Sequence, residues 1–124
     1  MILVDSSVWI SHFKHANLHL ASVVVAGEIL CHPLVIGEVS CGTPPSRKAV
    51  LSDLKMLDQV TVASMTEVLE FIESKRLFGR GCGFVDLSLL TSTMITQGAM
   101  LWTADKRLAS IAAEMQVLYA PPLH

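Results

Sequence analysis

Short apolar runs alternate with amphipathic segments along the whole chain. The first run, residues 1–4, is wholly apolar and is followed directly by Asp5. Uniform runs of this kind are typical of strands that are buried on both faces of a parallel sheet. Further short strands are predicted at residues 28–32, 60–63, 100–103 and 116–119.

Helical patterns lie between these strands. Ser6 or Ser7 is expected to cap a first helix, and Pro33 suits the first position of another helix that Gly42 ends. Residues 18–26 are assigned to a helix, although their three consecutive valines also suit a strand. The remaining predicted helices cover residues 46–57, 66–78, 84–97 and 105–115.

This alternation of strands and helices predicts the fold class. Parallel strands joined by helical crossovers give an α/β fold, here a three-layer α/β/α sandwich around a central parallel sheet. At 124 residues the chain is expected to form a single domain over residues 1–124. In such a fold, ligands bind beyond the carboxyl ends of the central strands.

The composition is rich in apolar residues, because 52% of the chain is hydrophobic and only 16% is charged. We therefore expect one face to meet a partner, either a second copy in a homodimer or a bound protein. The longest apolar stretch, residues 18–30, is too short and too interrupted to cross a membrane, so we expect a cytoplasmic protein. The three cysteines show no paired spacing and are interpreted as small core residues.

The net charge of −2 does not exclude a nucleic-acid partner. Phosphate binding normally requires a cationic surface. If four of the eleven acids hold cations, the other seven are outnumbered by the nine lysines and arginines, which leaves about +2 on the rest of the surface.

Four acids lie at positions where a ligand site is expected. Asp5 follows the first strand, Asp105 follows the predicted strand 100–103, and Glu38 and Asp86 lie early in helices that can abut those strand ends. Each acid also has a structural explanation. Asp5 and Asp105 could cap helices, Asp86 could favour a helix dipole, and Glu38 could simply be solvated.

Taken together, the four acids favour a cation site. Two carboxylates about 6 Å apart repel each other by about 3 kcal/mol at an effective dielectric constant of about 20, so a cluster of four needs compensating charge. Lys106 and Arg107 are expected to face outward beside Asp105. Acidic oxygen-rich pockets are typical of Mg²⁺ or Mn²⁺ sites, where such ions activate water and stabilise the leaving oxygen of a phosphodiester.

Four sequence segments resemble the PIN-domain ribonucleases, and among them the VapC-type toxins of type II toxin–antitoxin (VapBC) systems. These segments are residues 3–10 (LVDSSVWI), 36–38 (IGE) with Gly42, 83–87 (GFVDL) and 101–108 (LWTADKRL). Any one of them is weak, but the set covers nearly the whole chain in the same order and spacing.

The resemblance implies a metal-dependent endoribonuclease with Asp5, Glu38, Asp86 and Asp105 as the catalytic, metal-binding acids around Mg²⁺ or Mn²⁺. Ser7 and Thr103 are expected to support them. We expect Asp5 and Asp86 to ligate directly, and Glu38 and Asp105 partly through water. The resemblance also implies an RNA substrate, a homodimer, and a cognate antitoxin protein whose tail enters the pocket.

Other interpretations remain at this point. Arg80, in the glycine-rich loop before Asp86, is a candidate RNA contact, and its alternative is a plain surface arginine. The chain could be a PIN-fold nuclease of RNA processing outside a toxin–antitoxin pair, or a binding module without catalysis. A receiver-like signalling domain shares the size and an acidic pocket, but it needs paired acids after the first strand, where this chain has Ser6 and Ser7.

Overall fold

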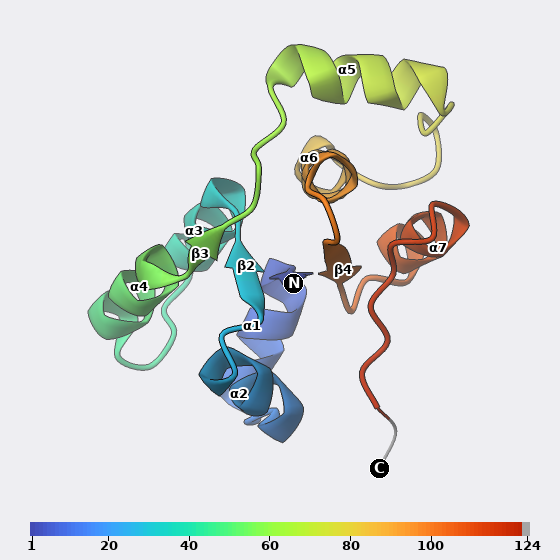
Figure 1. The fold of residues 1–124 in the computed structure, drawn as a ribbon. Coiled ribbons are helices and arrows are strands. Elements are labelled where there is room, and N and C mark those ends of the chain that lie inside the picture. Colours follow the sequence, from blue (N-terminus) through green and yellow to red (C-terminus); the bar gives the residue numbers. More distant parts are fainter. Residues whose placement is uncertain (123–124) are drawn as a thin grey trace.

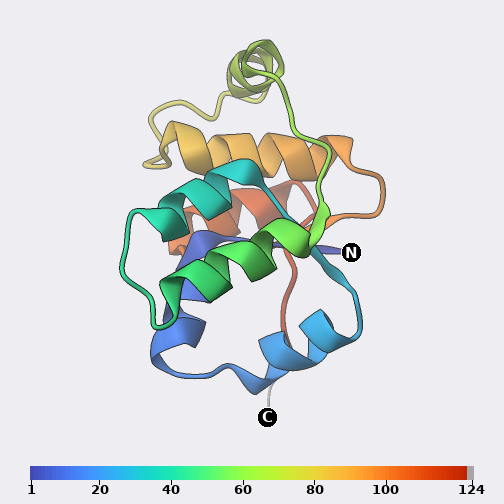
Figure 2. The same cartoon turned by 90° about the vertical axis from the view of Figure 1, so that its left-hand side faces the viewer.

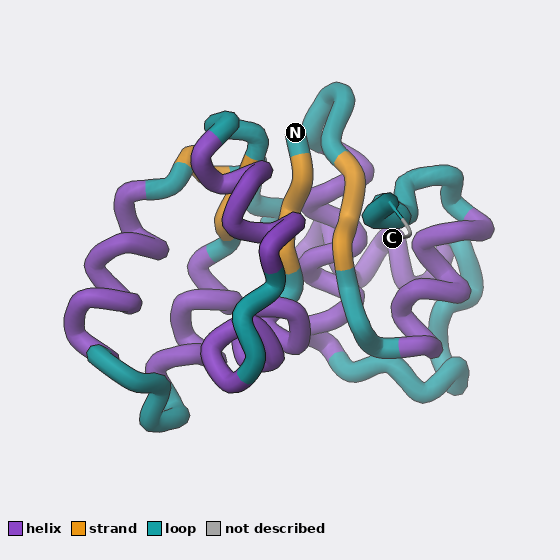
Figure 3. The backbone as a smooth tube through the Cα atoms, turned by 90° about the horizontal axis from the view of Figure 1, so that it is seen from below, coloured by secondary structure: helices purple, strands orange, loops and turns teal. Residues whose placement is uncertain are grey.

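The computed structural model of the protein describes residues 1–122 and has a parallel sheet at its centre. The strands are β1 (Ile2–Val4), β2 (Ile29–Cys31), β3 (Asp58–Gln59) and β4 (Met100–Trp102), in the order β3-β2-β1-β4. Ile2 pairs with Ile29 on one side and with Met100 on the other, so β1 and β4 run side by side (Figure 3). All three residues of β1 are buried, as the uniform apolar run predicts.

Helices cover both faces of this sheet, which confirms the predicted three-layer sandwich. Helix α6, with α5 outside it, lies on one side, and α2 lies on the other (Figures 1 and 2). The helices are α1 (Ser6–Lys14), α2 (Leu18–Val25), α3 (Pro33–Ser40), α4 (Arg47–Met56), α5 (Met65–Ser74), α6 (Phe84–Ile95) and α7 (Lys106–Glu114).

Helix α6 is the most deeply buried helix, because it contacts α5, α7 and β4. All residues from Leu87 to Thr93 are buried. The threonine hydroxyls in this stretch donate to backbone carbonyls one turn earlier, Thr91 to Leu87 at 2.7 Å and Thr93 to Leu89 at 2.8 Å. The hydroxyls are therefore satisfied without water, and Asp86 stands at the start of a rigidly packed helix.

The start of α1 differs from the prediction in a way that concerns the site. Ser6 is already helical, so the prediction that Ser6 or Ser7 caps this helix is wrong. Asp5 occupies the capping position, and its backbone carbonyl accepts from Val8, but its carboxylate makes no capping hydrogen bond. In contrast, Pro33 is the first residue of α3, as predicted.

Three element boundaries were predicted wrongly. The third strand is Asp58–Gln59 rather than 60–63, because the paired register with β2 covers only these two residues and ends with a hydrogen bond from Val60 N to Cys31 O at 3.0 Å. The predicted strand 116–119 makes only one isolated bridge, from Leu118 to Leu101. Helix α5 ends at Ser74 rather than residue 78, since Arg76 adopts a left-handed conformation with φ of 53°.

The sheet order also decides against a receiver-like domain. Receivers have the flavodoxin-like order, in which β1 lies between β2 and β3. Here β1 lies between β2 and β4, and β3 is at the edge.

All three cysteines are free. Cys31 is buried and half-buried Cys82 packs against the core, so the core interpretation was wrong for exposed Cys41. Within residues 1–122, no helix has the length and apolar character needed to span a membrane.

Candidate active site

Asp5 is a buried acid, with only 3% of its surface exposed, at the carboxyl end of a central strand. Its Oδ2 atom accepts hydrogen bonds from Ser7 Oγ at 2.8 Å and from Thr103 Oγ1 at 2.7 Å. Ser6 Oγ lies 3.4 Å from Oδ1. Hydroxyl groups thus hold the carboxylate in place without neutralising it.

The same hydroxyls connect Asp5 to the segment after β4. Ser7 Oγ accepts from the backbone N–H of Ala104 at 3.1 Å, and Thr103 Oγ1 accepts from that of Asp105 at 3.1 Å. Each hydroxyl therefore donates to Asp5 and accepts from the next segment, which fixes its orientation. The structure brings both predicted supporting residues, Ser7 and Thr103, onto Asp5.

Glu38 reaches the site from the exposed face of α3. Its Oε1 atom accepts a hydrogen bond from Ser6 Oγ at 2.8 Å. Ser6 is 8% exposed and links Glu38 to Asp5, a role that sequence reasoning missed. The only signal for it was the position of Ser6 next to Asp5, because the partner is 32 residues away.

Asp86 and Asp105 stand at helix starts. Asp105 caps α7 by accepting from Leu108 N at 2.9 Å, and Asp86 accepts from the N–H of Gly83 at 3.3 Å. Burial raises the pKa of Asp86 above its usual value, and the charges of Asp5, Asp105 and Glu38 raise that pKa further. These effects outweigh the hydrogen bond from Gly83, which lowers it. The charges of Asp5, Asp105 and Glu38 therefore all act on Asp86.

The donor set fits a hard divalent cation, because it consists of carboxylate and hydroxyl oxygens. Across residues 1–122, none of the four acids forms an ion pair with a lysine or arginine. Over the same part of the chain, no three acid, histidine or cysteine side chains are close enough to share one ion as they stand. A cation at Asp5 would therefore need the outer acids to move inward or to act through water.

Two arginines hold the loop before α6, Arg80 through an ion pair and Arg107 through its packing on Gly81. Arg80 pairs with Glu114 on α7 at 2.6 Å, so its contact with RNA remains a prediction. Arg107 is exposed, as expected, and its side chain lies across Gly81, where its nearest atoms would be 2.7 Å from an added Cβ. Gly81 has φ of +86°, so this position favours glycine for its backbone, and an added Cβ would also make the Arg107 side chain move. The loop that leads to Asp86 is thereby packed against α7.

Comparisons with known proteins show that this chain is similar to proteins named ribonucleases. Residues 2–114 match the PIN domain family. Two curated relatives are named Ribonuclease VapC32, from Mycobacterium tuberculosis strains CDC 1551 / Oshkosh and ATCC 25618 / H37Rv. The chain is 46% identical to each over 120 residues, which is 97% of this chain and 97% of each relative.

Proposed function

Because the chain belongs to the PIN domain family, we propose that it is a metal-dependent endoribonuclease and the toxin of a type II toxin–antitoxin pair. The observation that carries this proposal is the buried carboxylate of Asp5, which hydroxyls orient and Ser6 links to Glu38. Within residues 1–122, Asp5, Glu38, Asp86 and Asp105 form no ion pair with a basic side chain. The names of its relatives supply the nuclease activity and the toxin class.

The four acids would hold Mg²⁺ or Mn²⁺, with Asp5 and Asp86 as direct ligands and Glu38 and Asp105 acting partly through water. When bound, such a cation makes water more acidic and offsets charge on the phosphoryl oxygens. Asp5 is the fixed point of the set, because hydroxyls from two segments orient it before any ligand arrives.

The other residues position this set. Ser6 and Ser7 orient Glu38 and Asp5, and Thr103 joins Asp5 to the backbone of Asp105. The buried stretch from Leu87 to Thr93 fixes the start of α6, where Asp86 lies. Arg80 remains our candidate for a phosphate contact, which would require it to leave Glu114.

Two partners belong to the proposal, an antitoxin protein and a second copy of the chain. Several large apolar residues are exposed, among them Leu18 and Val25 on α2, which are 82% and 88% exposed, and Met65 and Leu69 on α5. Apolar residues at such positions favour association. Light scattering of the purified chain tests the homodimer, and a stoichiometric complex that silences RNA cleavage tests the antitoxin.

The enzymatic claim is tested by incubating structured RNA with the purified protein and Mg²⁺ or Mn²⁺. We expect cleavage within the RNA chain, and no cleavage by the variant Asp5→Asn under the same conditions. Equal cleavage in EDTA would contradict the metal-dependent mechanism. Equal cleavage by Asp5→Asn would point to a contaminating nuclease or to a site elsewhere.

A further inference from the structure

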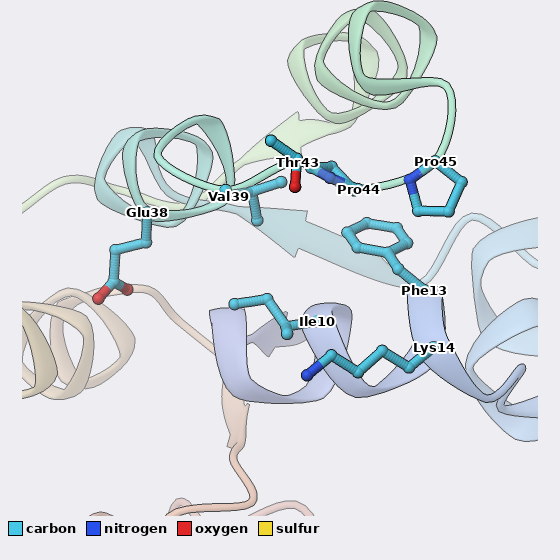
Figure 4. Close-up of a pocket in the computed structure, with 9 residues that line it drawn as sticks. Ile10, Phe13, Lys14, Glu38, Val39, Thr43, Pro44 and Pro45 are labelled. Atoms are coloured by element: carbon cyan, nitrogen blue, oxygen red, sulfur yellow. The ribbon is translucent and has the colours of Figure 1, made fainter.

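An apolar pocket adjoins the acidic site, and Glu38 forms part of its edge (Figure 4). Its volume is about 260 Å³. Ile10, Phe13 and Lys14 of α1 form one wall, and residues 43–45, between α3 and α4, form the other. We call it the α1–α3 pocket. A group bound in it would lie directly beside the proposed cleavage centre.

The walls of the α1–α3 pocket are held in place before any ligand binds. Pro44 and Pro45 have restricted backbone angles. Arg47 braces the segment that precedes them, since its side chain donates to the carbonyl of Gly42 at 3.2 Å and to that of Ser40 at 2.6 Å. On the other wall, Phe13 stacks on Trp9 with ring centroids 6.1 Å apart. Such a pocket loses little conformational freedom on binding.

One basic and one acidic side chain border the α1–α3 pocket, Lys14 on the α1 wall and Glu38 at the edge shared with the acidic site, so the Lys14 end favours an anionic group on a flat apolar ligand. Lys14 is exposed and forms no ion pair with any part of the chain between residues 1 and 122. Figure 4 shows its side chain running along α1 toward Ile10, on the wall facing Thr43. The Thr43 hydroxyl points into the space between the walls and offers a polar contact (Figure 4). A cation beside an apolar slot suits a phosphate that carries a planar base.

We propose that the α1–α3 pocket binds one nucleotide of the RNA substrate, next to the phosphodiester that is cut. The base packs against Phe13 and the prolines, and the phosphate of that nucleotide meets Lys14. This inference rests on the proposed ribonuclease function and assigns its substrate a defined path past Glu38. Because every base has a flat face, the pocket contributes affinity with little base specificity.

A protein segment is the rival occupant, since the apolar walls would also accept a side chain. An apolar side chain would leave the charge of Lys14 unmatched, whereas each nucleotide brings its own phosphate. The pocket also shares Glu38 with the acidic site, which places a bound nucleotide next to the proposed cleavage centre.

The test uses a short RNA that the wild-type protein cuts, remade with a single abasic nucleotide at each position near the cut. We expect one position at which loss of the base lowers kcat/KM by about 5- to 150-fold, the range for a stacked base. The variant Thr43→Phe fills the pocket from an exposed loop position. In this variant, loss of the base at the sensitive RNA position should lower kcat/KM no more than loss of a base at the neighbouring RNA positions.

A second variant tests the charge. Lys14→Gln should raise KM more than it changes kcat, and it should reduce the slope of log affinity against log salt by about 0.7, as expected for one phosphate contact on a single strand. The matched control is Lys75→Gln, an exposed lysine at the end of α5, remote from α1 (Figure 1), which should behave as the wild type. Melting curves of both lysine variants and Thr43→Phe should match that of the wild type.

The outcomes separate the two levels of the proposal. Failure of the wild-type protein to cut RNA would overturn the proposed function, and the pocket assignment with it. Cleavage with the same abasic profile and salt slope in all variants would overturn the pocket assignment alone. Unchanged RNA kinetics together with loss of a protein complex in Thr43→Phe would overturn it in favour of a protein occupant.

Discussion

Asp5 and Asp86 are the two direct ligands that we propose for one cation, but the structure holds them by different means. Asp5 is 3% exposed, and its carboxylate accepts from the hydroxyls of Ser7 and Thr103 rather than from a helix. Asp86 is half-buried and accepts from the backbone of Gly83 at the start of α6. Asp105 resembles Asp86, because it caps α7.

The difference shows which acid carries the strongest functional signal. Acids at helix starts stabilise helices in many proteins, so Asp86 and Asp105 would have a structural use even without a ligand. Asp5 occupies a capping position and yet makes no side-chain capping bond. A buried carboxylate that is oriented by hydroxyls and left without a counter-charge is better explained by a bound cation.

The largest expected effect separates Asp5 from Asp105. Asp5→Asn should lower kcat/KM for RNA cleavage by at least about 10²- to 10³-fold, as for loss of a group that stabilises the transition state. Asp105→Asn should cost less, because asparagine still caps α7 and the acid acts partly through water. Cleavage assays at saturating Mn²⁺ measure both. Losses of equal size would remove the distinction between the two acids.

Asp86→Asn should also impair cleavage, but it should stabilise the metal-free fold. The raised pKa of Asp86 means that its contribution to stability is greatest below its ordinary pKa and is lost as the pH rises through the raised value. Asparagine avoids that loss. In EDTA, the melting temperature of Asp86→Asn should exceed that of the wild type at pH 7, and the gain should shrink toward pH 3.

Asp53→Asn, at an exposed acid on α4, is the control for that experiment. This variant should leave the wild-type difference in melting temperature between pH 7 and pH 3 nearly unchanged. A lower melting temperature for Asp86→Asn at pH 7 would show that the bond to Gly83 outweighs the repulsion.

Thr103→Val tests the hydroxyls around Asp5. The substitution keeps the shape but removes the donor to Asp5 and the acceptor for Asp105 N. We expect a loss of about 1.5–3 kcal/mol in the free energy of unfolding, as for a hydrogen bond to a charged group. Urea denaturation measures it, with Thr61→Val at an exposed position as control. If both variants lose the same amount, the hydroxyls do not hold Asp5.

His32 provides the smallest effect and a contrast with Asp5. It follows the neighbouring strand β2 and is 2% exposed; its Nδ1 atom caps α3, but its Nε2 atom has no partner within the part of the chain described. Burial lowers the pKa of His32. The neutral imidazole therefore contributes to stability above the ordinary pKa of histidine, and this contribution is lost as the pH falls through and below that ordinary value.

Between pH 7.5 and pH 5, this loss is at most about 1.4 kcal/mol per pH unit. His32→Asn keeps a capping side chain and should make the melting temperature depend less on pH over that range. The control variant His15→Asn, at the exposed end of α1, should leave the pH dependence of the melting temperature unchanged. An unchanged pH dependence in His32→Asn would show that His32 titrates freely.

The sequence predicted the order of elements well because burial and helix ends have local signals. The apolar run of β1 and the proline at the start of α3 were both read correctly. The third strand was misplaced because β3 is short, exposed and defined by its pairing with β2, which leaves no apolar pattern. The bridge of Leu118 to Leu101 depends in the same way on contacts distant in sequence.

The candidate site was predictable as a set of acids but not as a geometry. The four carboxylates follow strands or begin helices, and those positions could be read from the sequence. Two contacts of the site join residues far apart in the chain: the hydrogen bond from Ser6 to Glu38 and the packing of Arg107 on Gly81. No local sequence pattern predicts such contacts. The α1–α3 pocket likewise depends on how Arg47 braces its loop.

The central claim is that Asp5 anchors a cation site, and Mn²⁺-dependent melting tests it without any assumption about the RNA. At a free Mn²⁺ concentration ten times the dissociation constant, binding should stabilise the wild-type protein by about 1.4 kcal/mol, or about 5 °C. The rise should vanish in Asp5→Asn, and it should persist in Asp53→Asn. No rise in the wild type, or an equal rise in Asp5→Asn, would contradict the claim.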